Sequence, residues 1–301
     1  MEYDLIIIGG GCAGYPAAVY AARFNLKTVI IAKEPGGLIT TTHLVENFPG
    51  FISLTGQELA DKLEAHAKAN NVPIENDIVS SIEKQDNLFI VKTSIKKQEY
   101  KTKTVILATG TKHKHLDAPG EEKFSAKGVS YCASCDGPLY KNKVVGIVGG
   151  SDGASKEAMV LAKNSSKVYM FVRTNLKAEP INATRIKALS NVEIVEGVEV
   201  KEICGEQFVT HVILNNEQKV DLEGLFIAIG HVPQNELAKQ LNVNLNEKGE
   251  IIIDRLSKTS VDGVMAAGDV TDMPWKQGVI GSAEGSVAAY SAFEYINKNF
   301  K

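Results

Sequence analysis

The sequence has little cysteine, no excess of basic residues and no long uninterrupted apolar run. Only 4 of its 301 residues are cysteine, which is too few for a scaffold stapled by disulfides. Lysine and arginine number 33 against 36 acidic residues, giving a net charge of −3. Without a basic surplus to neutralise phosphates, we expect no nucleic-acid partner. The content of 44% hydrophobic and 23% charged residues is typical of a globular protein long enough for two domains.

The longest stretch without charge covers residues 5–22. Its length approaches that of a membrane span, but several glycines and Pro16 interrupt it. Two acids, Glu2 and Asp4, precede it, whereas a signal peptide begins with basic residues. We therefore expect a buried strand, a glycine turn and a helix here, in a cytoplasmic protein with no membrane partner.

Two segments, 3–34 and 142–173, follow the same plan. Each runs from an apolar strand through a glycine-rich turn and an alanine-rich helix to a second apolar strand, which is a β-α-β unit with parallel strands. Residues 75–110 and 192–230 alternate apolar and polar positions, which predicts a small antiparallel meander after each unit. The expected fold class is α/β, with two doubly wound, Rossmann-like, three-layer domains.

The first glycine turn has the spacing of a dinucleotide-binding site. Gly9, Gly11 and Gly14 form G-x-G-x-x-G directly after the apolar strand 5–8. In this motif the first glycine permits a tight turn, the second lets backbone N–H groups approach a pyrophosphate, and the third lets the helix pack close to the strand. The helix N-terminus then stabilises the phosphate charge. The acid expected about 20 residues further on could be Glu34, but we assign it no ribose contact.

The second glycine turn departs from this spacing. Gly149 is in place, but Ser151 replaces the second glycine and Ala154 takes the last position. A serine Cβ crowds the place at which backbone would meet a pyrophosphate. Arg173, after the next strand, either contacts a 2′-phosphate or is a solvated charge at a strand end, and the sequence leaves both interpretations open.

The segment SYCASCDGPLY contains two cysteines, Cys132 and Cys135, followed directly by Asp136. A zinc site needs four ligands, and the other cysteines, Cys12 and Cys204, stand alone, so we expect no metal. A structural disulfide is disfavoured in a reducing compartment. We therefore favour a redox-active dithiol, in which Asp136 supplies the proton that disulfide exchange requires. The alternative for Asp136 is an ordinary acid of a turn or a helix cap.

Six segments occur together in an order and a spacing that match one known family: GGGCAG, GGLITTTHLVENFPGF, ILATGTKHKHL, YCASCDG, IAIGHVPQN and AAGDV. Through them the chain resembles the low-molecular-weight thioredoxin reductases from end to end. The resemblance implies a homodimeric enzyme that contains FAD and reduces a disulfide of thioredoxin or a glutaredoxin-like protein. It also implies an FAD domain split between residues 1–112 and 242–301, with a second domain, residues 113–241, inserted into it.

The resemblance further implies roles for single residues. In the family the inserted domain rotates, so that the dithiol faces the flavin in one position and thioredoxin in the other. By this match Cys135 is the thiol nearer the flavin, Cys132 attacks the thioredoxin disulfide and Asp136 donates a proton. The residues implied around FAD are Gly9, Gly11, Gly14, Gly37, Asn47, Gly110, Gly268, Asp269, Lys276 and Gln277.

The departures from the family pattern cluster at the site of the electron donor. Ser151 breaks the second glycine motif, and Val172-Arg173-Thr174 replaces the HRR sequence that reads the 2′-phosphate of NADPH. Losing arginine contacts to a phosphate is not a conservative change. The donor is therefore either NADPH or NADH at an eroded site, or ferredoxin or a reduced deazaflavin without nicotinamide use. A flavoprotein that binds a partner without turnover is a third hypothesis, against which the intact dithiol argues.

Overall fold

The computed structural model describes residues 2–42 and 45–300, apart from the side chain of Cys135. His43 and Leu44, which belong to one of the segments that carry the resemblance, therefore lie outside the described residues. Within the described ranges, no helix is both long enough and apolar enough to cross a bilayer.

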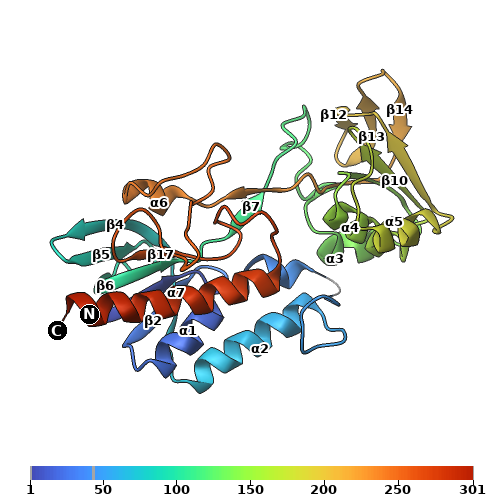
Figure 1. Cartoon of the computed structure of the whole chain (residues 1–301). Coiled ribbons are helices and arrows are strands. Elements are labelled where there is room, and N and C mark those ends of the chain that lie inside the picture. The colour runs from blue at the N-terminus through green and yellow to red at the C-terminus, as the bar shows by residue number, and fades with distance from the viewer. Residues whose placement is uncertain (1, 43–44, 301) are drawn as a thin grey trace. The chain divides into compact units, whose positions relative to one another are not determined.

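The chain divides into two compact units, of which residues 113–231 form the second (Figure 1). The first unit combines residues 1–112 with residues 232–301. The boundary expected from the sequence, at residue 242, lies ten residues too late. Helix α6 (Glu236–Gln240) belongs to the first unit because its buried Leu237 packs into the hydrophobic core there.

The first unit contains a seven-stranded sheet, most of it parallel. Strands β3, β2, β1 and β6 follow one another, β17 lies beside the second half of β6, and the antiparallel pair β5 and β4 continues from its first half. The strands are β1 (Glu2–Ile8), β2 (Thr28–Ala32), β3 (Ile74–Asn76), β4 (Val79–Gln85), β5 (Leu88–Thr93), β6 (Glu99–Leu107) and β17 (Val264–Ala266). The apolar sequence of β2, TVIIA, is buried throughout, as expected for a parallel strand covered on both faces.

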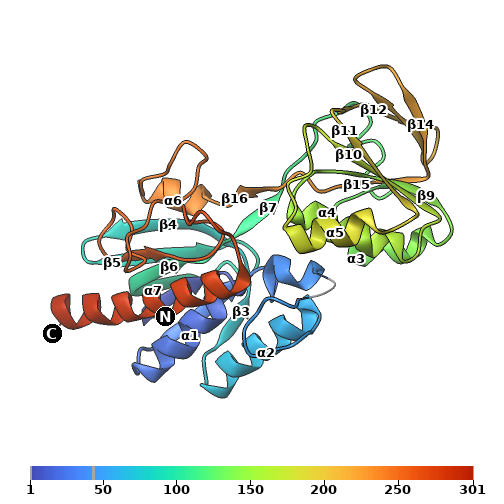
Figure 2. The ribbon, with the colours of Figure 1, turned by 45° about the vertical axis from the view of Figure 1, so that its right-hand side comes forward.

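Helices cover one face of this sheet. Helices α1 (Gly14–Arg23) and α7 (Gly278–Asn299) run side by side, and α2 (Gly56–Ala69) packs against α1 (Figure 2). Small residues let α1 and α7 approach closely, since a Cβ on Gly285 would lie only 2.1 Å from the carbonyl oxygen of Ala13. A short 3-10 helix, η1 (Gly37–Thr41), follows β2.

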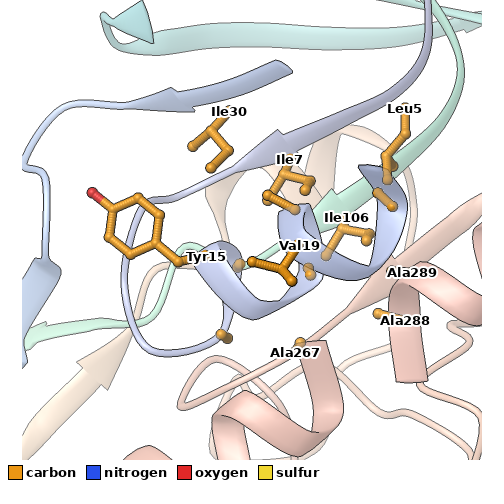
Figure 3. Packing of buried hydrophobic residues seen from close by; sticks show 14 of the residues in the cluster. Leu5, Ile7, Tyr15, Val19, Ile30, Ile106, Ala267, Ala288 and Ala289 are labelled. Carbon is orange, nitrogen blue, oxygen red and sulfur yellow. The ribbon is translucent and has the colours of Figure 1, made fainter. Parts of the chain in front are cut away.

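The main core of the first unit lies between the sheet and these helices (Figure 3). Ile7, Ile30 and Ile106, from three neighbouring strands, are fully buried and pack with Val19 and Tyr15 of α1. Each such side chain contributes about 1.5–3 kcal/mol through its removal from water. A second apolar cluster covers the opposite face of the sheet and includes residues of the β4–β6 meander. The turns at the ends of the strands therefore extend from a sheet that is packed on both faces.

The second unit has a parallel sheet in the order β11-β10-β9-β15-β8. Its strands are β8 (Val129–Ser130), β9 (Val144–Val148), β10 (Lys167–Val172), β11 (Val192–Glu196) and β15 (Gly224–Ile227). An antiparallel sheet consists of β12 (Val200–Gly205), β13 (Val209–Leu214) and β14 (Lys219–Asp221). The helices are α3 (Ala133–Asp136), η2 (Gly137–Tyr140), α4 (Asp152–Ala162) and α5 (Pro180–Lys187). Separate apolar clusters bind the antiparallel sheet and the helices to the parallel sheet.

The two connections between the units are β7 (Thr111–His113) and β16 (His231–Pro233), which pair with each other as a two-stranded ribbon. The chain thus leaves the first unit and returns to it on neighbouring strands. The predicted α/β class, with two Rossmann-like units and the second inserted into the first, is confirmed.

Candidate active site

Four parallel strands of the first unit end at the same edge of its sheet. Ile8 at the end of β1 pairs with Ile31 of β2 and Leu107 of β6, and Ala266 of β17 also pairs with Leu107. Ligands of doubly wound sheets bind outside this edge, at the carboxyl ends of the strands. The turns that follow these strands contain the predicted residues Gly9, Gly11, Gly37, Gly110, Gly268 and Asp269.

The glycines of the first turn meet two different demands. A Cβ on Gly9 would lie 2.1 Å from the carbonyl oxygen of Ala108, and a Cβ on Gly14 would lie 1.9 Å from that of Gly9. Packing therefore leaves no room for a side chain at Gly9 or Gly14. A Cβ on Gly11 would find no atom closer than the carbonyl oxygen of Gly36, at 3.5 Å. Gly11 thus presents open backbone next to the N-terminus of α1.

Two further glycines leave the same edge free of side chains. Gly37 and Gly110 both have φ of +63°, in the left-handed region that favours glycine. The nearest atom to a Cβ on Gly37 would be the Cα of Gly11, at 3.5 Å, and a Cβ on Gly110 would meet nothing within 4 Å. Bare backbone beside a helix N-terminus is what a pyrophosphate needs for close approach.

Asp269 follows β17 and is partly buried. It lines a recess together with Gly268, Lys276 and Glu284. Burial raises the pKa of the Asp269 carboxyl, and the charge of Lys276 partly offsets this. Burial, and then the charge of Asp269, raise the pKa of the free Cys12 thiol to about 12. Cys12 therefore stays protonated at neutral pH, which removes it as a candidate nucleophile.

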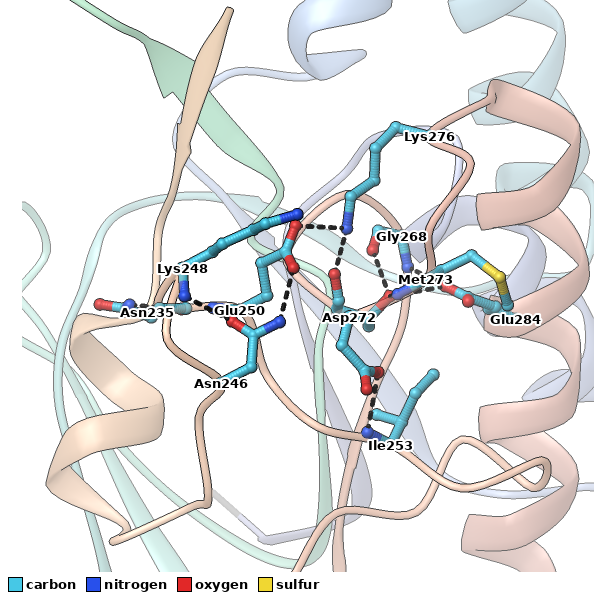
Figure 4. Close-up of polar contacts among 12 residues, drawn as sticks. Asn235, Asn246, Lys248, Glu250, Ile253, Gly268, Asp272, Met273, Lys276 and Glu284 are labelled. Atoms are coloured by element: carbon cyan, nitrogen blue, oxygen red, sulfur yellow. Dashed lines mark hydrogen bonds and ion pairs between the residues drawn. The ribbon is translucent and has the colours of Figure 1, made fainter.

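Lys276 and Gln277, both predicted near the flavin, have different partners. The Lys276 ammonium forms an ion pair with Glu250 Oε1 at 3.1 Å and donates to the carbonyl oxygen of Thr271 (Figure 4). Gln277 Oε1 accepts a hydrogen bond of 2.9 Å from Asn47 Nδ2. The fold therefore brings Asn47 and Gln277 together across 230 residues of sequence. It turns Lys276 toward an acid of its own unit.

A buried acid that the sequence did not mark lies at the same recess. Glu284 of α7 is 6% exposed, and its Oε2 accepts the N–H of Gly268 at 2.7 Å and lies 3.3 Å from Thr271 Oγ1 (Figure 4). Within the described part of the chain its Oε1 has no hydrogen-bond partner. Burial raises the pKa of this carboxyl. The signal that could have found it is a lone acid in the small-residue stretch GSAEGSVAA.

The cysteine motif begins a single helical turn in the second unit. Cys132 directly precedes α3 and is disulfide-bonded, while the side chain of Cys135 lies outside the described part of the structure. Ser130 Oγ donates to Asp136 Oδ2 at 2.6 Å and accepts the backbone N–H of Cys132 at 3.1 Å. Asp136 is the N-cap residue of η2, but its side chain makes no capping hydrogen bond there. One serine thus links the acid to the backbone of the first cysteine.

The residues before and after this helical turn differ in their contacts and exposure. Tyr131, directly before Cys132, donates a hydrogen bond of 2.5 Å to Glu121 Oε1 and lies 2.9 Å from His115 Nδ1. Burial and the contact with Glu121 raise the pKa of the Tyr131 hydroxyl. Leu139, in η2 directly after this turn, is 72% exposed. No group of three or more potential metal ligands occurs among the residues that the structure describes.

In the second glycine turn, Ser151 occupies the end of helix α4 with its own side chain. Its Oγ accepts the N–H of Ala154 at 3.2 Å, so this serine is the helix N-cap. Gly149, with φ of +148°, would place a Cβ 2.3 Å from the carbonyl oxygen of Ala228. The turn therefore keeps the tight strand-to-helix packing of the motif, while the cap uses a donor that would otherwise face a phosphate.

The predicted phosphate-reading residue, Arg173, is exposed and has an acidic neighbour. Its Nε lies 3.8 Å from Glu199 Oε1, and its side chain is 79% exposed. The N–H of Lys177 donates to the carbonyl oxygen of Gly150 at 2.7 Å, which lays this segment onto the turn. Asp152, in the first turn of α4, pairs with Lys156 at 3.0 Å and accepts hydrogen bonds from the Glu179 N–H and from Asn182. Arg173 thus has an acidic partner of its own unit, and the N-terminus of α4 already has a side-chain cap.

The family model for pyridine nucleotide-disulphide oxidoreductases matches residues 3–289. Among curated relatives, the F subunit of alkyl hydroperoxide reductase in Staphylococcus aureus is 39% identical over 304 aligned positions, which cover 99% of this chain. An NADH dehydrogenase from Bacillus subtilis is 37% identical with the same coverage of this chain. The chain spans only 60% and 59% of the lengths of these two relatives, respectively.

Solved structures match along nearly the whole length of both chains. A thioredoxin reductase from Lactococcus lactis is 32% identical with a TM-score of 0.95, over 98% of this chain and 99% of that one. A thioredoxin reductase from T. acidophilum is 36% identical with a TM-score of 0.92, over 97% and 98%. A ferredoxin-flavin thioredoxin reductase from Clostridium acetobutylicum is 33% identical with a TM-score of 0.54, over 99% of each chain.

Proposed function

This chain belongs to the pyridine nucleotide-disulphide oxidoreductase family, and we propose that it is an FAD-dependent thioredoxin-disulfide reductase. It passes two electrons through the Cys132/Cys135 dithiol to a disulfide of thioredoxin or a glutaredoxin-like protein. One observation carries the proposal: a disulfide-bonded Cys132 at the start of a helical turn, in a C-x-x-C-D sequence, with Asp136 bonded to the same serine as the Cys132 backbone. The names of the structural neighbours support the same activity.

The edge of the first sheet fits FAD. Gly11, Gly37 and Gly110 leave room for the pyrophosphate beside the N-terminus of α1, because a Cβ at each would meet nothing closer than 3.5 Å. Asp269, partly buried in the recess that follows β17, would receive the ribityl hydroxyls. Asn47 and Gln277, held by their mutual hydrogen bond, would contact the flavin ring. When bound, FAD supplies the conversion between the electron donor and a two-electron dithiol.

The dithiol chemistry uses residues of the second unit. The Cys132 thiolate attacks one sulfur of the partner's disulfide, forms a mixed disulfide and expels the partner's second sulfur, to which Asp136 gives a proton. The Cys135 thiol then attacks Cys132, releases the partner's remaining thiol and closes the Cys132–Cys135 disulfide. Two electrons from the dithiol, one proton from Asp136 and one proton from the Cys135 thiol convert the disulfide of the partner into a dithiol. The hydrogen bonds of Ser130 place the Asp136 carboxyl close to the backbone of the attacking residue.

A protein partner is favoured over a small disulfide by the surface next to the dithiol. Leu139, four residues after Cys135, exposes 72% of an apolar side chain, which a docking protein would cover. A thioredoxin or glutaredoxin-like protein presents an exposed disulfide of suitable size. We place the reaction in the reducing cytoplasm and expect the enzyme to be a homodimer, as its resemblance to the family implies.

Two electron donors compete, and the second glycine turn favours the less usual one. Ser151 caps α4, and Arg173 is exposed beside Glu199. These features weaken a site for NADPH or NADH. A ferredoxin-flavin thioredoxin reductase among the structural neighbours supports ferredoxin as the alternative, and a reduced deazaflavin is a further donor that would need no nicotinamide site.

Transfer to the partner can be measured without knowledge of the donor. The purified holoprotein is reduced anaerobically with a limiting amount of dithionite and mixed with oxidised thioredoxin or glutaredoxin. The thiols of the partner are then counted by alkylation and mass spectrometry. We expect one partner disulfide reduced per reduced chain, none with Cys132→Ser, and wild-type behaviour with the control Cys204→Ser. A wild-type flavin that is reduced while both partners stay oxidised would overturn the proposed function.

An anaerobic titration then identifies the donor. NADPH, NADH and reduced ferredoxin are added separately to the oxidised holoprotein, and the visible flavin band is followed. Rapid bleaching by NADPH or NADH means that the second turn still binds a nicotinamide dinucleotide. Bleaching by ferredoxin alone means that Ser151 and its neighbours mark a lost nucleotide site.

A further inference from the structure

Glu157 is an acid on the buried stripe of helix α4. It lies three residues after Ala154 and four before Leu161, and both of these are buried in the core of the second unit. Residues at this spacing share one face of a helix. The Oε2 of Glu157 is enclosed and lacks a hydrogen-bond partner among the residues that the structure describes. A carboxyl in this position is costly to bury, so its presence calls for a physical reason.

The one hydrogen bond of the Glu157 carboxyl within the described residues leads to the dithiol helix. It accepts the backbone N–H of Ala133, the first residue of α3. The peptide group of this N–H joins Ala133 to Cys132, so the acid holds the amide next to the disulfide-bonded cysteine. Ala133 is 1% exposed and packs in the same apolar cluster as Ala154. Glu157 is thus held against the first residue of α3, the helix that contains the dithiol motif.

The surroundings allow this carboxyl to change charge near neutral pH. Burial raises the pKa of Glu157 to about 7, and the hydrogen bond from Ala133 offsets this only in part. The charged or titratable groups of the elements around it are Lys156 and Asp152 on α4, Asp136 on α3, Tyr140 on η2, Lys167 and Tyr169 on β10, and Arg185 and Lys187 on α5. None of them is a source of the shift in Glu157. Burial is therefore the cause of the raised pKa of this carboxyl.

We propose that Glu157 is a positioning residue that sets the reactivity of the dithiol through its own proton, an inference that rests on the proposed function. When neutral, Glu157 accepts the hydrogen bond from the Ala133 N–H and does not repel a nearby thiolate. When ionised, it disfavours the thiolate form of the dithiol, because like charges at short range in a buried site repel.

Glu157 takes up a proton during the redox step but forms no covalent bond in it. Disulfide reduction takes two electrons and two protons to give two thiols, and one of these thiols ionises to the reactive thiolate. The charge of that thiolate favours the protonated form of Glu157, so reduction draws one further proton from solvent onto the carboxyl in the pH range where Glu157 titrates. Oxidation returns this proton to solvent. The two titrations are therefore coupled and belong to the pair of groups rather than to either alone.

The test measures thiol reactivity, which needs neither a donor nor a protein partner. The holoprotein is reduced with dithiothreitol, desalted anaerobically and treated with iodoacetamide between pH 5.5 and 9.5. Alkylation is followed on peptide 128–141, which trypsin releases after Lys127 and Lys141 and which excludes Cys12 and Cys204.

Glu157→Gln keeps the volume and the oxygen that accepts the Ala133 N–H but removes the titrating proton. We expect this variant to react faster than wild type near pH 8, where wild-type Glu157 is ionised, by up to about tenfold, which is the limit that one pKa unit of the thiol sets. Below pH 6 the two rates should converge, because Glu157 is then neutral in the wild type as well. A purely structural role for Glu157 would not produce this convergence at low pH.

Lys156→Gln is the matched control, since it changes a charge on the same helix at a residue that instead pairs with Asp152 at 3.0 Å. It should leave the alkylation profile unchanged. Superimposable profiles for wild type and Glu157→Gln would overturn the inference, even if the wild type reduces thioredoxin. If the wild type reduces no partner but the profiles diverge as expected, the proposed function fails and the coupling stands.

A second measurement covers the case in which Glu157→Gln does not fold. Infrared difference spectra between the oxidised and reduced wild type, recorded at pH 7.5 with and without ¹³C-labelled glutamate, report a carboxyl that gains a proton on reduction. A positive protonated-carboxyl band that shifts with the label supports the coupling. Its absence would refute it.

Discussion

Two substitutions in the first glycine turn separate packing from cofactor binding. Gly14→Ala places a Cβ 1.9 Å from the carbonyl oxygen of Gly9, whereas ordinary contacts lie at 3.4–4 Å. Helix α1 must therefore move, and overpacking of this kind costs about 1–3 kcal/mol. The higher helix propensity of alanine returns up to about 1 kcal/mol. We expect Gly14→Ala to lower the free energy of unfolding of the FAD-free protein by about 1–2 kcal/mol.

Gly11→Ala should behave in the opposite way. The new Cβ would lie 3.5 Å from its nearest neighbour, and the φ of Gly11 is outside the left-handed region. The FAD-free protein should be as stable as wild type or more stable by up to about 1 kcal/mol, because alanine lowers the entropy of the unfolded chain. The added methyl group does, however, fill the place at which backbone meets the pyrophosphate. FAD affinity should fall at least about tenfold, which corresponds to about 1.4 kcal/mol.

Both effects are measured on protein stripped of FAD. Urea unfolding followed by circular dichroism gives the stability, and the quenching of FAD fluorescence on rebinding gives the affinity. The reasoning is refuted if Gly11→Ala binds FAD as tightly as wild type, since the turn would then not cradle the pyrophosphate. It is refuted equally if FAD-free Gly14→Ala unfolds at the wild-type urea concentration.

Three further predictions concern single polar contacts. Ser130→Ala removes the hydrogen bond to Asp136 and should slow thioredoxin reduction about tenfold, which a stopped-flow assay measures, and an unchanged rate would argue against this support of the acid. Ser151→Gly removes the cap of α4 at a cost of only a few tenths of a kcal/mol and should speed flavin bleaching by NADPH, and no gain would mean that the serine is not the obstacle. Glu284→Gln should remove the part of the pH dependence of stability that comes from this carboxyl. The measurement is the urea midpoint of the FAD-free wild type and variant at pH 5 and pH 7. Because burial raises the pKa of Glu284, the folded state binds the proton more tightly than the unfolded state, and wild-type stability falls relative to Glu284→Gln as pH rises above the ordinary glutamate pKa. An equal midpoint difference at both values of pH would contradict this.

The glycine turns and the strands and helices next to them were predictable because backbone geometry leaves few alternatives there. The spacing of Gly9, Gly11 and Gly14 predicted a strand, a turn and a helix, and the structure has all three. The end of the inserted unit was misplaced because α6 is short and its apolar residues fit either unit in sequence. Only the three-dimensional packing of Leu237 shows which core receives it.

The electrostatic part of the candidate site could not be predicted from residue order. The sequence showed that Ser151 breaks a motif, but not that its hydroxyl satisfies the N–H of Ala154. It placed Lys276 near the flavin, but not its ion pair with Glu250. Glu157 passed unnoticed because its burial is decided by the packing of α4 against other elements, and no local pattern marks a costly acid in advance.

The pairing of β7 with β16 bears on whether the inserted unit can be removed from the chain or moved to another protein. Because they are neighbours in one ribbon, the two ends of the inserted unit lie about 4.8 Å apart, the usual spacing of hydrogen-bonded strands. Units whose ends lie close together tolerate transplantation, since neither host nor insert must stretch to accommodate the junction. The segment 113–231 can therefore be excised as a cassette, and a two-residue hairpin loop would suffice to reseal the parent fold behind it.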